Sequence, residues 1–174
     1  GTNYVEIAKD IAVSPDGHVY LAGTASSATG SPNTLTAGSI TVTNVNREDA
    51  ILVCLDATGA FQWVQRVGGG SNRQWGLSVA VNGNNGVALG GYGSSQFDFG
   101  GGVTNTLTGS QQGFVAYYNA AGVLQWRRAF NNIASSTVSS LDISPDGHIY
   151  AAGDFNGTMD FGSGFNLSSN GAAD

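Results

Sequence analysis

The two histidines of the chain, His18 and His148, are the first residues whose type could support metal binding or general-base chemistry. They hold the same position in two copies of a repeated segment, SPDGHVYLAG and SPDGHIYAAG, whereas Gly86 holds it in a third copy. No further ligand type recurs beside them, as a metal site would require. We therefore interpret both histidines as residues that flank a turn, and we predict no catalytic residue and no metal centre from them.

Carboxylates in glycine-rich segments suggest a second chemistry. Asp98 and Asp160 share a repeat position in the segments FDFG and MDFG, and Asp154 precedes Asp160 by six residues. Carboxylate and carbonyl oxygens on such loops can bind calcium. The D-x-D-x-D series of a calcium-binding loop is absent, however, and aspartate is expected in turns without any ligand. Calcium therefore stays an alternative at these three residues, and no cofactor is predicted.

The sequence otherwise lacks the motifs of an active site, so we predict that the chain is not an enzyme. It has no G-x-S-x-G segment, no Cys/His cluster and no phosphate-binding loop. The single cysteine, Cys54, lies in the apolar run AILVCL, where a buried and unreactive thiol is expected. With 6 Lys+Arg against 12 Asp+Glu, the net charge of −6 argues against nucleic acid as a partner. No apolar run of about 18 residues is present, so we expect no membrane insertion.

The three tryptophans are the remaining candidates for contact with a ligand. Trp63 and Trp126 each follow a glutamine at the same repeat position. We interpret both as packing residues, with stacking on a sugar as the alternative. Trp75 has no aromatic equivalent in the first repeat and stands in the segment NRQW between two repeats. We therefore expect Trp75, together with Arg73, to contact a binding partner.

Residue positions can be compared in this way because the chain repeats itself. The segments AVSPDGHVYLAG (12–23), AVNGNNGVALGG (80–91) and DISPDGHIYAAG (142–153) align at offsets of 68 and 62 residues. A second, independent pair, LDATGAFQWVQRV (55–67) and YNAAGVLQWRRAF (118–130), aligns at an offset of 63. The sequence therefore predicts a first repeat over 1–67 and a second over 68–130. A partial third repeat over 131–174 stops before its third strand.

Each repeat is predicted to contain only β-strands joined by tight turns. In turns such as SPDG, proline sets φ at the second position and glycine supplies a positive φ. Glycines expected at positive φ are Gly17, Gly59, Gly86, Gly122 and Gly147. Glycines expected at a close backbone approach, to a neighbouring repeat or at a β-bulge, are Gly23, Gly91 and Gly153. No segment has a helical period, so the helix content should be near zero.

Four strands in about 65 residues, with glycine-rich connections, are typical of one blade of a β-propeller. We therefore predict an all-β fold: a partial β-propeller of about 2.5 four-stranded antiparallel blades, enlarged between the second and third strands. A single blade cannot bury both of its faces, and propellers close as rings. We accordingly expect the chain to be part of a longer polypeptide or to be completed by other protein chains.

The succession DIAVSPDGHVYLAG, then MDFG with LSSNGAAD, then AILVCLDATGAFQW resembles the SBBP-type bacterial β-propeller repeat. The resemblance covers essentially the whole chain, although the first repeat lacks the DFG element and the second has NGNNG in place of SPDGH. It implies a large secreted or surface-attached bacterial protein, often one exported by type IX secretion. It implies no catalytic residue.

We therefore expect a non-catalytic scaffold or binding module of a secreted bacterial surface protein, acting in adhesion, assembly or carbohydrate contact through the loops of one rim. One alternative is a propeller enzyme, a hydrolase or lyase, whose active site lies in other blades. Another is a passenger fragment bound to a secretion or surface machine. The expected partners are other blades, other protein chains or carbohydrate, and the expected location is outside the cell or on its surface.

Overall fold

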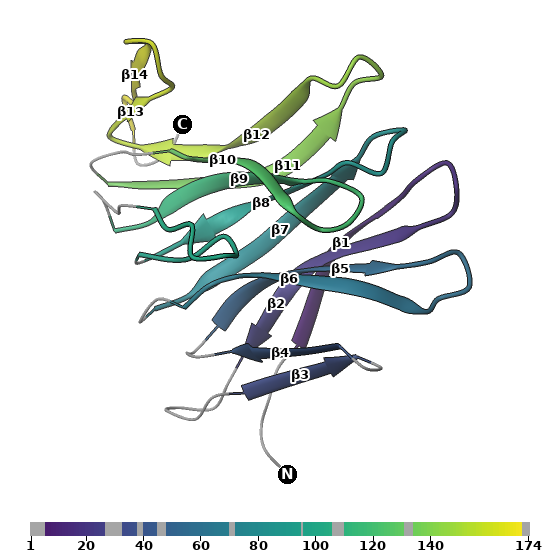
Figure 1. The fold of residues 1–174 in the computed structure, drawn as a ribbon. Helices are drawn as coiled ribbons and strands as arrows, with labels where there is room; N and C mark the ends of the chain where they lie inside the picture. The colour runs from purple at the N-terminus through teal and green to yellow at the C-terminus, as the bar shows by residue number, and fades with distance from the viewer. Residues whose placement is uncertain are drawn as a thin grey trace.

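The computed structural model describes residues 6–26, 33–37, 40–44, 48–69, 72–94, 96–105, 110–130 and 134–171. Within these residues the chain forms β-strands and no helix, which confirms the predicted all-β class (Figure 1). Residues 172–174, where the predicted third repeat stops, lie outside the described part. No helix long and apolar enough to cross a lipid bilayer occurs among the described residues.

Eight of the strands form two four-stranded antiparallel sheets, as predicted. The first sheet has the order β1-β2-β5-β6 and comprises β1 (Glu6–Val13), β2 (Val19–Ser26), β5 (Glu48–Leu55) and β6 (Phe61–Val67). The second sheet has the order β7-β8-β9-β10 and comprises β7 (Gln74–Val81), β8 (Val87–Gly93), β9 (Gln112–Tyr118) and β10 (Leu124–Ala129).

The remaining strands form two-stranded sheets. The third sheet pairs β11 (Ser135–Ile143) with β12 (Ile149–Asn156). Small hairpins follow the second strand of the first and third repeats: β3 (Asn33–Ala37) with β4 (Ile40–Asn44), and β13 (Thr158–Asp160) with β14 (Asn166–Ser168). The second repeat has a single bridge, Asp98 to Thr104, at this place. It lies 62 residues before the pair Asp160 and Asn166, so the repeat period extends to these pairings.

The three sheets stack face to face in chain order, and each interface is apolar (Figure 1). Between the first and second sheets lie Tyr20 and Leu52 from one side and Leu89 and Phe114 from the other, all fully buried. Burying large side chains of this kind contributes about 1.5–3 kcal/mol each. A smaller cluster, centred on Val115 and other residues of the second sheet, packs against the third sheet. No closed sheet forms among the described strands.

Hydrogen bonds at the same repeat position join the first strands of the three sheets. The Asp10 carboxylate on β1 accepts from the Ser78 hydroxyl and from the Val79 N–H on β7, both at 2.9 Å. The Ser78 hydroxyl in turn accepts from the Leu141 N–H on β11 at 3.0 Å. Asp10 and Ser78 are equivalent residues of successive repeats. The same kind of hydrogen bond, from a backbone N–H to a side-chain oxygen of the preceding sheet, therefore joins the first sheet to the second and the second to the third.

The glycines that recur in the second strand of each repeat lie opposite a β-bulge of their own sheet. A Cβ at Gly91 would lie 1.9 Å from the Trp75 carbonyl oxygen, and one at Gly153 would lie 1.9 Å from that of Thr137. Gly23 approaches the first strand of its own sheet in the same way. The register of the first strand shifts beside each glycine. Of the two expected causes, the structure therefore selects the bulge and not a neighbouring repeat.

Five hairpin turns that join neighbouring strands of the three main sheets share one hydrogen-bond pattern, in which the N–H of the first residue donates to the carbonyl of the fifth. The smaller turns 99–103 and 161–165 show the same bond. The five hairpin turns comprise residues 14–18, 56–60, 82–86, 119–123 and 144–148. The fourth residue has positive φ in each, and it is the predicted glycine in four of them. The prediction for Gly86 is wrong: Asn85 takes the positive φ, at 59°. Asparagine tolerates this region, while Gly86 makes room for the Tyr117 hydroxyl, 1.9 Å from where its Cβ would lie.

Candidate functional site

The five hairpin turns lie along the same side of the stacked sheets, and we refer to them together as the turn rim (Figure 1). Their sequences, SPDGH, DATGA, NGNNG, NAAGV and SPDGH, contain three aspartates and two histidines but no lysine or arginine. The turn rim is therefore acidic at neutral pH. Each turn is closed by its own side chain and backbone groups, so this surface is ordered without a ligand.

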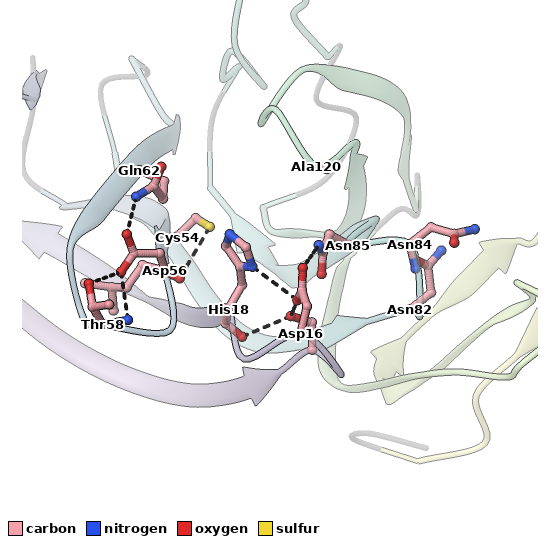
Figure 2. A network of polar contacts seen from close by, with 12 residues as sticks. Asp16, His18, Cys54, Asp56, Thr58, Gln62, Asn82, Asn84, Asn85 and Ala120 are labelled. Atoms are coloured by element: carbon pink, nitrogen blue, oxygen red, sulfur yellow. Dashed lines mark hydrogen bonds and ion pairs between the residues drawn. The ribbon is translucent and has the colours of Figure 1, made fainter.

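Asp16 connects two sheets at the turn rim (Figure 2). Its carboxylate accepts from the Ser14 hydroxyl in its own turn and, at 2.7 Å, from the Asn85 side-chain amide in the turn of the second sheet. The His18 Nδ1 lies 3.1 Å from the same carboxylate. These contacts, with Ser14 the strongest, hold the pKa of Asp16 well below its ordinary value. Asp16 is consequently ionised at any pH above the acid range.

The other two rim aspartates cap their own turns. Asp56 accepts from the Thr58 hydroxyl at 2.7 Å and from the Ala60 N–H at 2.9 Å (Figure 2). The hydrogen bond from Thr58 is the main cause of a lowered pKa at Asp56. Asp146 accepts from the Ser144 hydroxyl and lies 2.9 Å from His148 Nδ1, and these contacts lower its pKa, with Ser144 first. Both side chains keep their charge at neutral pH.

The Asp–His pairs of the turn rim resemble the base and orienting group of a hydrolase, but each stands alone. His18 and His148 belong to turns of the first and third sheets, and no hydrogen bond joins either imidazole to a serine, threonine or cysteine among the described residues. No group of three His, Cys, Asp or Glu side chains placed to hold a metal ion occurs in the described part of the chain. The described turns present hydrogen-bonding groups and negative charge.

Two of the three calcium candidates, Asp98 and Asp160, accept hydrogen bonds from backbone N–H groups of their own turns. Asp98 accepts from the N–H of Gly100 at 2.7 Å and of Gly102 at 3.0 Å. Asp160, one repeat later, accepts from the Gly162 N–H at 2.6 Å. Asp154 is an exposed residue of β12, paired with β11. Asp98 and Asp160 therefore act as turn caps, and none of the three belongs to a group of three or more His, Cys, Asp or Glu side chains placed to hold a metal ion among the described residues.

Trp75 and Arg73 lie at the contact between the first two sheets. The prediction that Trp75 lies in a connection between repeats is wrong, because Trp75 lies in β7. Its ring is stacked on Tyr92 at 6.0 Å, with Lys9 Nζ 4.9 Å above it, and its indole N–H donates to Glu48. Arg73 Nε lies 3.2 Å from the same Glu48 carboxylate. Trp75 is half-buried, so most of its ring is already in contact with protein.

The contact of Glu48 with Arg73 and Trp75 has an equivalent one repeat later, which indicates a role in joining the sheets. Glu48 bridges to Arg73, and Gln111, its equivalent, bridges to Ser135 in the same parallel manner. The Gln111 amide donates to Thr137 at 2.9 Å, where Thr137 is the equivalent of Trp75. Equivalent contacts thus join successive sheets in both places, although the residue types differ.

Trp63 and Trp126 are equivalent in sequence but differ in their surroundings. Trp63 packs at 5.9 Å from Tyr20, and its indole N–H donates to the Ala120 carbonyl of the second sheet at 2.9 Å. Trp126 stacks on Tyr117 at 5.8 Å and is 44% exposed. Cys54, which pairs with Trp63 in the sheet, is buried, and burial raises the pKa of its thiol.

Sequence reasoning missed two features that the structure brings together. The hydrogen bond between Asn85 and Asp16 joins two turns, and its only signal in the sequence is the exchange of SPDGH for NGNNG. Asp49 is fully buried and paired with Arg66 at 2.9 Å, a contact that the repeat hides because Gln112 replaces Asp49 in the second repeat. No family model and no curated protein matches the chain.

Proposed function

We propose that this chain is a segment of a β-propeller and serves as a non-catalytic binding scaffold of a secreted bacterial surface protein. Its three stacked sheets are successive blades in this proposal, and its partners are other protein chains. The resemblance of the sequence to SBBP-type repeats supports the blade assignment and the extracellular location.

One observation carries the proposal: successive sheets are joined by the same bonds at the same repeat positions. Asp10 and Ser78 each accept from a backbone N–H of the next sheet, at 2.9 and 3.0 Å. Repetition of one unit about a common axis presents equivalent turns along one rim, as the blades of a propeller do. The regular arrangement gives an ordered surface on which equivalent turns stand side by side.

The turn rim is the surface that we assign to partner binding. It is rigid, because the carboxylates and hydroxyls of its own turns hold it in place, so little conformational entropy is lost on binding. It carries Asp16, Asp56 and Asp146 with no lysine or arginine in the turns. Charge complementarity therefore favours a protein partner that presents lysine and arginine.

The test is binding of the purified chain to an array of basic, neutral and acidic peptides, with a glycan panel in parallel. The rim variant carries Asp16→Asn, Asp56→Asn and Asp146→Asn. Asparagine preserves these turns, because Asn84 and Asn119 already hold the equivalent positions of the second repeat. We expect saturable binding to basic peptides, weakened about tenfold or more in the rim variant and at raised salt.

The matched control removes the same number of charges elsewhere, through Asp98→Asn, Asp154→Asn and Asp160→Asn. It should bind basic peptides as the native chain does. Equal loss in both triple variants would show that net charge and not the turn rim is responsible. Binding only to glycans, or turnover of a glycan or peptide, would contradict the proposal.

A further inference from the structure

The third sheet has an open edge with an apolar pocket beside it. Among the described strands β12 pairs only with β11, whereas its equivalents β2 and β8 each have a strand on both sides. Next to this edge lies a pocket of about 270 Å³ between β12, the β13–β14 hairpin and the end of the second sheet. Its wall is mostly apolar and includes Phe130, Gly153, Met159 and Phe161.

The second sheet shows what fills this place one repeat earlier. There Phe114, on the third strand β9, is fully buried opposite Gly91 of β8. Its ring lies 5.5 Å from Phe97 and 5.6 Å from Phe99. Gly153, Met159 and Phe161 follow Gly91, Phe97 and Phe99 by 62 residues, and all three line the pocket. The pocket therefore has the walls of the Phe114 site.

Trp126 provides a second anchor on the neighbouring sheet. Its equivalent Trp63 receives the β9–β10 turn: it donates to Ala120, and a Cβ at Gly122 would lie 2.8 Å from the indole ring. Trp126 instead is 44% exposed. Only a turn with glycine at this point could approach an indole face so closely.

One hairpin can reach both anchors. Phe114 precedes Gly122 by eight residues, and in the first repeat Ile51 precedes Gly59 by the same eight. The first strand of such a hairpin would place a large apolar side chain opposite Gly153, and its turn would then lie at Trp126. The pocket beside Gly153 and the exposed face of Trp126 are thus spaced so that one hairpin can contact both.

On the basis of the proposed blade arrangement, we infer that the β12 edge, the pocket and Trp126 together form an acceptor site for a β-hairpin of the repeat's own pattern. The hairpin carries an aromatic or β-branched residue eight positions before the glycine of an Asx-type turn. Strand addition gives the backbone hydrogen bonds, and the pocket selects the side chain.

The test places this hairpin on the full chain as a copy of residues 113–130 appended after Asp174, which aligns with Gln112. Two controls carry the same tail with Phe114→Asp in the copy, or with its residues shuffled. A fourth chain combines the native tail with Trp126→Ala at the original position. Thermal unfolding and hydrogen exchange of residues 149–156 are the readouts, and a free peptide of residues 110–130 is titrated onto the untailed chain.

We expect the native tail to raise the unfolding midpoint by about 5 °C or more and to slow exchange in β12. The Phe114→Asp and shuffled tails should give neither effect, and Trp126→Ala should remove part of the gain. An unchanged midpoint with unprotected β12 amides would overturn the inference. So would a concentration-dependent dimer of the untailed chain that protects β12, since the occupant would then be a second copy.

The outcome is separable from that of the turn-rim experiment. A tail that fails while basic peptides still bind the rim overturns the acceptor site alone. A tail that stabilises β12 in a chain whose rim binds nothing supports the acceptor site and overturns the rim assignment.

Discussion

The indole N–H of Trp63 donates to the carbonyl of Ala120 at 2.9 Å, a contact that joins two sheets across 57 residues of sequence. Trp126 is the equivalent residue one repeat later and is 44% exposed, so the two tryptophans can be compared directly. We predict that Trp63→Phe lowers the free energy of unfolding by about 1–2 kcal/mol, because a hydrogen bond and part of the ring packing are lost.

Trp126→Phe is the control and should change the free energy of unfolding by less than about 0.5 kcal/mol. Urea unfolding of both variants measures the difference. Equal destabilisation by the two substitutions would show that the contact between Trp63 and Ala120 does not hold the sheets together.

A second prediction concerns the bulge glycines. Gly91→Ala would place a Cβ 1.9 Å from the Trp75 carbonyl oxygen, so the bulge must open. We expect a loss of about 2–4 kcal/mol in the free energy of unfolding. Gly83→Ala is the matched control, because nothing lies within 4 Å of a Cβ there and its φ is not positive. It should be neutral or slightly stabilising. A tolerated Gly91→Ala would contradict the bulge explanation.

A third prediction concerns acid. Asp16, Asp56 and Asp146 have pKa values lowered by hydrogen bonds in the folded state. Below the ordinary value of 3.8 the unfolded chain binds protons that the folded chain does not. The stability that these groups add is therefore complete above this pH and is lost as the pH falls below it.

The measurement is the thermal midpoint between pH 6 and about pH 2 for the native chain and the Asp16→Asn, Asp56→Asn, Asp146→Asn variant. We expect a shallower decline below about pH 4 in the variant, since three of the responsible groups no longer titrate. The Asp98, Asp154 and Asp160 triple variant serves as the control for net charge. Parallel curves for the rim variant and the native chain would refute the assignment.

The local structure could be predicted from the sequence where a single turn or strand decides it. Gly17 and Gly147 each end a copy of the segment SPDG, and the positive φ of both follows from the chemistry of this turn alone. Gly86 was misassigned because two neighbours, Asn85 and Gly86, can both adopt positive φ. The choice depends on Tyr117, which comes from a strand some thirty residues later.

Contacts between sheets were not predictable in the same way. Trp75 looked like a connecting residue because it interrupts the repeat, yet it lies within β7 and bonds to Glu48, which is 27 residues away. The pocket beside β12 depends on how Phe161 of the β13–β14 hairpin packs against Phe130 and Phe155. Local sequence patterns do not show which residues of different strands and sheets come into contact. Once the sheets are placed, the equivalence of repeat positions explains both the Trp75–Glu48 contact and the pocket beside β12.

Successive repeats stack through equivalent bonds, and hydrogen exchange at two amides tests this stacking most directly. The N–H of Val79 donates to Asp10, and that of Leu141 donates to Ser78. Both amides should be protected in the native chain. Asp10→Ala should speed exchange at Val79 about tenfold or more and leave Leu141 protected, while Ser78→Ala should expose Leu141. Rapid exchange of both amides in the native chain would contradict the stacking of the three sheets.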